Sequence, residues 1–201
     1  MKLFLTSAGF PTNNLKTFFL DHLGKKPGEI KVVMIAYAKN PVELIYVNLS
    51  KREFRGMGFE NILMLNLTDS LSPELLDDTD LVYVCGGNTF AILKRLRETK
   101  LDGKIIELVK NGAIYVGVSA GSIIAGPNIE IAGWGSEGDT NEVGLTDLGG
   151  FSLTNTAVFP HYHDELQAEV EEFRKKVSYQ IETLTNEQML FVEDGQVELV
   201  Q

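Results

Sequence analysis

The sequence has only one cysteine, three histidines and no long hydrophobic run. The single cysteine, Cys85, excludes an internal disulfide, and this sparse usage is typical of proteins in a reducing compartment. The longest strongly apolar stretch, 32–38, is far shorter than the ~20 residues that span a bilayer. Residues 1–14 also lack the apolar core of a signal peptide. We therefore expect a cytoplasmic protein that has no membrane partner.

Positive charge is scarce as well. The chain has 18 Lys and Arg against 28 Asp and Glu, which gives a formal net charge of −10. Phosphate backbones and anionic lipids are bound through clustered Lys and Arg side chains. The composition therefore argues against nucleic acid as a partner.

The order of apolar segments predicts an α/β fold. A chain of 201 residues that is 44% hydrophobic suits one domain, 1–201, with an ordinary core. Candidate strands are 2–7, 31–38, 61–67, 81–86 and 113–118, with amphipathic helical segments at 14–23, 41–56 and 88–99 between them. Such alternation indicates right-handed βαβ units in a three-layer, doubly wound, mostly parallel sheet. Functional residues should lie just after strands, because ligands bind at the carboxyl ends of strands in such sheets.

The pattern changes after residue 126. Glycines accumulate among polar residues over 126–151, which predicts loops or short antiparallel strands. Residues 164–184 have the charged periodicity of one long helix. The segment 189–200 predicts a small C-terminal hairpin that turns at Asp194-Gly195.

The best candidate for a nucleophile is Ser119. Residues 117–121 read G-x-S-x-G and lie between a predicted strand and a plausible helix. A nucleophile elbow needs small residues on both sides of its serine, because the strained turn brings the backbone close to its neighbours. Ser122 lacks that arrangement. The plainer alternative is a glycine-rich turn whose serine only caps the next helix.

A second glycine motif, at 86–90, follows another predicted strand. An oxyanion hole pairs the N–H group after the nucleophile, here that of Ala120, with an N–H group from a neighbouring loop. Gly87 is the best candidate for that second donor. The alternative is a plain turn in which Asn88 caps a helix.

Three histidines are available as a general base: His22, His161 and His163. His22 falls in a predicted helix. His161 follows a short apolar run and a proline, where a strand would deliver it to the edge of the sheet, and we take it as the base. His163 has the same side-chain parity in an extended chain and stays an alternative. Either could instead be an ordinary hydrogen-bonded surface histidine.

The acid that would orient the histidine is less defined by the sequence. Asp139, Asp147, Asp164 and Glu193 are all candidates, because a triad is set by geometry and not by chain order. Glu193 follows the terminal apolar strand, which resembles a position at the edge of the sheet. Each of these acids could equally be a solvated surface group.

Together these motifs resemble the aspartyl dipeptidase family, also called peptidase E. The resemblance rests on GGNTF at 86–90, GVSAGS at 117–122 and Pro160-His161 further on, and it covers nearly the whole chain. It implies a fold similar to class I glutamine amidotransferases. It also implies a Ser-His-Glu triad of Ser119, His161 and Glu193, with the N–H groups of Gly87 and Ala120 as the oxyanion hole.

Substrate preference does not follow from the resemblance. Family members that cleave Asp-X dipeptides use an arginine in the helix after the catalytic histidine. That segment here holds Arg174, Lys175 and Lys176, with no motif that fixes their register. The family also includes cyanophycinases, so an N-terminal aspartate is not implied.

Three other site types fit the sequence less well. A glutamine amidotransferase would need a cysteine in the elbow, and Cys85 lacks the flanking glycines that an elbow requires and is interpreted as a small buried strand residue. Residues 133–138 fit G-x-G-x-x-G, but no helical pattern follows to receive a pyrophosphate. The run 161–164 offers two imidazoles and a carboxylate, whereas catalytic zinc normally needs three protein ligands in good geometry.

We therefore expect a serine peptidase, an exopeptidase or dipeptidase, that hydrolyses small peptides through an acyl-enzyme on Ser119. His161 would accept the Ser119 proton and Glu193 would orient the imidazole. No cofactor or metal is expected, and we expect a monomer or homodimer. The alternatives are an inactive module of the same fold that binds a peptide or small molecule, and an amidase that acts on a non-peptide amide.

Overall fold

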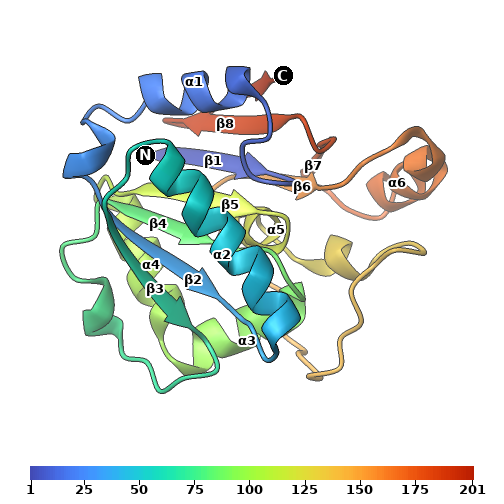
Figure 1. Ribbon diagram of the computed structural model, residues 1–201. Helices are drawn as coiled ribbons and strands as arrows, with labels where there is room; N and C mark the ends of the chain where they lie inside the picture. Colours follow the sequence, from blue (N-terminus) through green and yellow to red (C-terminus); the bar gives the residue numbers. More distant parts are fainter.

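The computed structural model describes all residues, 1–201, and is built on a seven-stranded sheet (Figure 1). The strand order is β3-β2-β4-β5-β1-β8-β9. Its strands are β1 (Lys2–Thr6), β2 (Lys31–Ala36), β3 (Asn61–Asn66), β4 (Leu81–Val84), β5 (Ile114–Val118), β8 (Met189–Glu193) and β9 (Gln196–Val200). The first five pair in parallel, which confirms the five predicted strands. The predicted hairpin forms too, and β8 joins it to the sheet by pairing antiparallel with β1.

Helices cover both faces of this sheet, as Figure 1 shows. They are α1 (Asn13–Asp21), α2 (Pro41–Gly56), α3 (Thr89–Glu98), α4 (Leu101–Lys110), α5 (Ala120–Ala125) and α6 (Gln167–Arg174), with short 3-10 turns η1 (Pro27–Glu29), η2 (Pro73–Leu76), η3 (Glu130–Gly133) and η4 (Asp164–Leu166). Successive residues of a strand point to opposite faces. Thus Phe4 packs with α1 and α2, whereas Leu3 and Leu5 pack with α3, α4 and α5. The three-layer fold class is therefore confirmed.

The segment 164–184 differs from the predicted single helix. Only η4 and α6 are helical, and the chain then forms β7 (Gln180–Thr183). This strand pairs in parallel with β6 (Thr156–Phe159), and the two make a separate small sheet. Ile181 and Leu184 are buried in this arrangement. Burial of these side chains in tertiary packing outweighs the helical periodicity of the charged residues before them.

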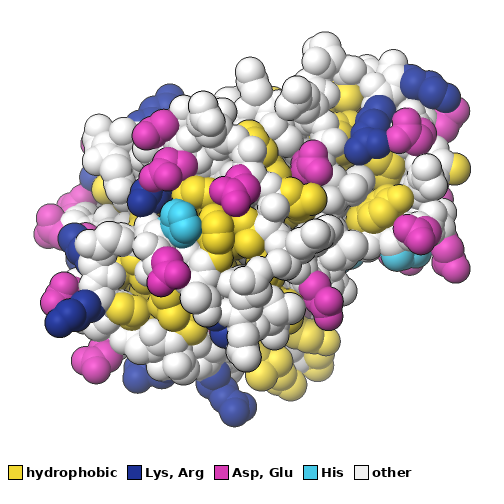
Figure 2. All heavy atoms as spheres, turned by 90° about the horizontal axis from the view of Figure 1, so that it is seen from above, with side chains coloured by type: hydrophobic (Ala, Val, Ile, Leu, Met, Phe, Trp, Pro, Cys, Tyr) yellow, Lys and Arg dark blue, Asp and Glu magenta, His cyan; other side chains and the backbone are white.

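The glycine-rich region 126–151 is mostly loop, as predicted. It contains the short η3 turn and one isolated antiparallel bridge between Asn128 and Gly149. None of the helices combines the length and the apolar character that a membrane crossing requires. On the face shown in Figure 2, Lys and Arg side chains are dispersed among acidic ones and do not gather into one patch.

Candidate active site

Ser119 occupies a sharp turn between β5 and α5. Its backbone has φ 50° and ψ −110°, a strained conformation for a residue with a side chain. The Ser119 N–H group donates to the carbonyl oxygen of Thr6 at 2.8 Å, which ties the turn to β1. The Ser119 hydroxyl makes no capping hydrogen bond to α5. The simple capping interpretation is therefore wrong, and the hydroxyl is left for another partner.

The flanking glycines are required by close backbone contacts. A Cβ atom on Gly121 would lie 2.2 Å from the carbonyl oxygen of Val84, and one on Gly117 would lie 2.7 Å from the backbone of Gly121. The Tyr115 hydroxyl donates to the carbonyl oxygen of Gly121 at 2.7 Å. These contacts hold the turn against β4 and β5, so the G-x-S-x-G pattern reflects packing as well as conformation.

His161 is the partner of the Ser119 hydroxyl. Its Nε2 atom lies 2.9 Å from Ser119 Oγ. The residue follows β6 with φ 59°, and its N–H group donates to Ser7 Oγ at 3.1 Å. The fully buried Ser7 hydroxyl in turn donates to the carbonyl oxygen of Leu184 at 2.9 Å. Ser7 thus joins the end of β1 to the loops after β6 and β7, a link that sequence motifs alone do not indicate.

The other ring nitrogen of His161 contacts an amide, not a carboxylate. Nδ1 lies 2.8 Å from Oδ1 of Asn186, in the turn after β7. With Oδ1 as acceptor, Nδ1 carries the proton and Nε2 is left unprotonated to face the serine hydroxyl. Asn186 is not among the residues predicted from the sequence, because residues 164–184 have the periodicity of a helix and β7 has only one buried side chain to indicate a strand.

Glu193, the predicted orienting acid, lies at the opposite end of the sheet. Strand β8 runs antiparallel to β1, so Glu193 pairs with Lys2 while Met189 pairs with Thr6. Its carboxylate forms an ion pair with the Lys2 ammonium at 3.1 Å. The prediction of Glu193 beside His161 is therefore wrong, because it assumed that the strand ended at the same edge as the parallel strands.

The remaining candidate acids do not contact His161. Asp139 accepts from the Thr89 N–H group at the start of α3, at 2.8 Å. Asp147 accepts from the N–H group of Gly149 and lies 3.4 Å from an Arg97 nitrogen. Asp164 begins η4 and is exposed. None of these three acids therefore orients the His161 ring.

The other histidines are also elsewhere. His22 stacks on Phe18, with ring centroids 4.1 Å apart, and caps the end of α1. His163 Nε2 lies 3.7 Å from Glu137, away from the serine.

No group of three or more His, Cys, Asp or Glu side chains could hold a metal ion, so 161–164 do not form the metal site considered above. No helix follows the 133–138 glycine run either.

The predicted oxyanion donors flank the serine. A Cβ atom on Gly86 would lie 3.3 Å from Ser119 Cβ, which shows how closely this loop approaches the nucleophile turn. Gly87 has φ 141°, and its N–H group donates to no backbone carbonyl. Ala120 is the first residue of α5, where N–H groups have no acceptor within a helix. Asn88 caps α3 by accepting from the Ala91 N–H group, as the alternative for this motif predicts.

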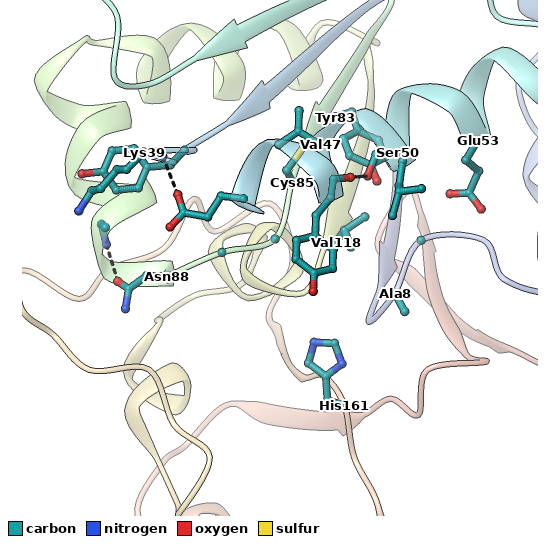
Figure 3. Close-up of a pocket in the computed structure, with 18 of the residues that line it drawn as sticks. Ala8, Lys39, Val47, Ser50, Glu53, Tyr83, Cys85, Asn88, Val118 and His161 are labelled. Atoms are coloured by element: carbon teal, nitrogen blue, oxygen red, sulfur yellow. Dashed lines mark hydrogen bonds between the residues drawn. The ribbon is translucent and has the colours of Figure 1, made fainter. Parts of the chain in front are cut away.

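Two cavities meet at Gly87 and His161, beside the serine. The larger one, about 740 Å³, lies between α2 and the ends of β4 and β5. Figure 3 shows Val47, Ser50 and Glu53 of α2 on one side of it and His161 on the other. The smaller cavity, about 120 Å³, lies between the glycine-rich loop and α6. Gly87 and His161 line both cavities, whereas Ser119 lines only the smaller one.

Burial raises the pKa of three ionisable groups that line the larger cavity, Glu53, Tyr83 and Cys85. It raises the pKa of the Cys85 thiol to about 12, so this buried side chain stays protonated. It also raises the pKa of Glu53, an effect opposed by the hydrogen bond that the carboxylate accepts from the Phe10 N–H group. Cys85 is buried, as predicted, although it lies just after β4 and not within the strand.

Sequence and structure comparisons agree on the family. The model of peptidase family S51 matches residues 3–200. The uncharacterized peptidases Lmo0363 of Listeria monocytogenes and Lin0382 of Listeria innocua are each 30% identical, over 97% of this chain and 96% and 94% of theirs. Peptidase E of Escherichia coli is 36% identical over 94 residues, which cover 45% of this chain and 38% of that protein.

Solved structures show the same fold. A crystal structure assigned to peptidase E from Listeria monocytogenes EGD-e superposes with a TM-score of 0.79 at 27% identity, covering 98% of this chain and 96% of that one. A peptidase from an acI-B1 actinobacterium gives 0.68 at 17% identity over 99% and 86% of the chains, a likeness of fold alone. The chain therefore belongs to peptidase family S51, the family of peptidase E, and is a serine-type peptidase.

Proposed function

We propose that this peptidase is an exopeptidase that hydrolyses small peptides through an acyl-enzyme on Ser119. One observation carries the proposal: a continuous chain of hydrogen bonds runs from Ser119 Oγ to His161 Nε2, and from His161 Nδ1 to Asn186 Oδ1. Ser119 itself lies on a strained turn that close backbone contacts hold in place. Such strain persists in functional sites, which favours an active enzyme over a binding module with a decayed site.

In the first step Ser119 Oγ attacks the peptide carbonyl carbon while His161 Nε2 takes the hydroxyl proton. The Oγ–C bond forms and the carbonyl electron pair moves to oxygen. Asn186 accepts the Nδ1 proton in a hydrogen bond and so fixes the ring orientation and tautomer. Because an amide carries no charge, it orients the imidazolium without neutralising it, as Asn does in Cys-His-Asn proteases.

The developing oxyanion needs donors, and the N–H groups of Gly87 and Ala120 are our candidates. Both belong to residues around Ser119 and neither has a backbone acceptor in the fold. Donors that are fixed before the reaction stabilise charge without reorganisation, and removal of one commonly costs about 10²-fold to 10³-fold in kcat.

His161 next acts as a general acid, and after that as a general base toward water. His161 gives its proton to the leaving amine as the C–N bond breaks, and the acyl group stays on Ser119. A water molecule then loses a proton to His161 Nε2 and attacks the ester carbon. The Oγ–C bond then breaks, and Ser119 Oγ takes that proton from His161, which restores the serine hydroxyl.

The sizes of the two cavities support exopeptidase activity. Ser119 opens onto the cavity of about 120 Å³, which has room for little more than one side chain, while the leaving portion can extend toward the cavity of about 740 Å³. A short acyl portion with a free amine fits this arrangement better than a long chain.

A fluorophosphonate probe tests the nucleophile. We expect mass spectrometry to find one adduct on Ser119 in the folded protein and none in Ser119→Ala, which should also lose all turnover of a dipeptide library. Adducts elsewhere, or equal turnover by the variant, would refute the assignment. Hydrolysis of simple amides without any dipeptide cleavage would favour the amidase alternative.

A further inference from the structure

The smaller cavity carries negative charge next to the nucleophile. We propose that it selects substrates whose acyl residue, the N-terminal residue of a dipeptide, has a cationic side chain such as that of Lys or Arg. This inference rests on the proposed peptidase function. Ser119 lines the smaller cavity and not the larger one, so in the binding mode proposed here the residue whose carbonyl is attacked places its side chain in the smaller cavity.

Three carboxylates line this cavity: Glu137, Asp139 and Glu169. No Lys or Arg lines it. The only basic ring near these acids beyond His161 is His163, whose Nε2 lies 3.7 Å from Glu137 on an exposed surface. Glu137 is exposed, whereas Asp139 and Glu169 are half-buried and pair with no Lys or Arg. Half-buried carboxylates without a cationic partner favour the binding of a cation from outside.

Glu169 is held in place by the glycine-rich loop. Its Oε2 accepts from the Ser136 N–H group at 3.2 Å, and its backbone carbonyl accepts from Trp134 Nε1 at 3.0 Å. A Cβ atom on Gly135 would lie 2.0 Å from Oε2, so the glycine makes room for the carboxylate. This fixed position distinguishes Glu169 from a solvated surface acid.

A second feature points to a polar ligand. Thr89 is fully buried, its hydroxyl has no hydrogen-bond partner, and the residue lines the same cavity. A buried hydroxyl without a partner costs free energy, which a bound ammonium group could recover by donating to it. Asp139 stands next to it, because Oδ2 accepts from the Thr89 N–H group. These two residues could therefore hold the α-amine of the same substrate.

The remaining walls suit the stem of a long basic side chain. They are apolar and include Ile123, Ile131, Trp134, Phe159 and Leu166. Lys and Arg bury their methylene stems against apolar surface while the charged head seeks polar partners. An apolar wall with carboxylates therefore matches these side chains better than it matches a short polar one.

The basic residues of the α6 region do not reach this cavity. Arg174 pairs with Glu171 at 2.6 Å, and Lys175 lies 3.8 Å from Glu172. Lys176 lies over the Trp134 ring, 3.8 Å from its centroid, and is not part of the cavity lining. An N-terminal aspartate would thus add a fourth carboxylate with no cation to balance it.

The test compares kcat/KM for Lys-Ala, Arg-Ala, Leu-Ala and Asp-Ala. We expect the two basic dipeptides to exceed Leu-Ala by about tenfold or more, since charge-assisted contacts of this kind change affinity on that scale. Glu169→Gln should lower the Lys-Ala to Leu-Ala ratio at least about fivefold while Leu-Ala itself changes little. Glu172→Gln, on the same helix but outside the cavity, is the matched control and should keep the ratio.

Binding separates this inference from the catalytic one. Calorimetry with Ser119→Ala should show tighter binding of Lys-Ala than of Leu-Ala, and the double variant with Glu169→Gln should lose that preference. Equal binding of the two, or a preference for Asp-Ala, would overturn the inference. A binding preference without turnover in the unmodified protein would instead support the cationic site and contradict the peptidase mechanism.

Discussion

The two ends of the central strands differ in what they hold. At the carboxyl ends lie the strained turn at Ser119, with φ 50° and ψ −110°, His161 and the buried Ser7 hydroxyl. At the amino end of β1 lie exposed ion pairs, Lys2 with Glu193 and the amino terminus with Asp194. Strained conformations cost about 1–3 kcal/mol each and persist only where the surroundings fix them. Exposed ion pairs contribute only about 0–1 kcal/mol. An acid that follows a strand in the sequence can therefore be placed at the active-site edge of the sheet only once the direction of that strand is known.

The largest expected effect comes from the packed glycine of the elbow. Gly121→Ala places a Cβ atom against the Val84 carbonyl, and we expect a loss of about 3 kcal/mol or more in the free energy of unfolding together with loss of activity. Thermal denaturation of this variant checks the expectation. Gly103→Ala is the control, since a Cβ there meets open space within α4 and should leave stability equal or raised by up to about 1 kcal/mol. Equal behaviour of the two would contradict the packing argument.

Asn186 is expected to show the next largest effect, as a positioning residue. Asn186→Ala removes the acceptor of the His161 Nδ1 proton, and we expect kcat to fall about 10-fold to 100-fold with little change in KM. Asn186→Asp should restore much of the rate. It should also move the acidic limb of the pH–rate profile to higher pH, because a carboxylate favours the protonated imidazole. An unchanged profile in Asn186→Asp would show that residue 186 acts only through packing.

The amino end should respond weakly. Glu193→Gln removes an ion pair whose side chains are 33% and 41% exposed, so we expect kcat within about twofold and a stability loss under about 1 kcal/mol. Side-by-side kinetics of Glu193→Gln and Asn186→Ala give the sharpest test of the comparison. A collapse of kcat in the Glu193 variant would reverse our assignment of the two ends.

The smallest effect concerns Cys85, which lies at the carboxyl end but outside the hydrogen-bond chain. Since burial raises the pKa of its thiol to about 12, the nucleophilic thiolate is essentially absent at neutral pH. We expect iodoacetamide at pH 8 to leave the folded protein unlabelled and fully active, and to label it after denaturation. Rapid labelling of the folded protein, measured by mass spectrometry, would contradict this.

The elbow could be predicted from sequence because its requirements are local. Gly117, Ser119 and Gly121 lie within one turn, and the strand before them is a continuous apolar run. The parallel strands could also be predicted, because burial on both faces makes them uniformly apolar. Strand β7 could not be predicted, since its four residues include only one buried side chain.

The sequence by itself determined the sheet, the strained serine turn and the histidine that follows a strand, because each depends on neighbours within a few residues. Only the tertiary structure decided which residue contacts Nδ1 of that histidine. The antiparallel direction of β8 takes Glu193 to the far edge, and the pairing of β7 with β6 brings Asn186 to Nδ1. It also decided that α6 presents Glu169 to the serine cavity and turns Arg174 away. Such choices depend on long-range pairing and helix rotation, which residue patterns do not encode locally.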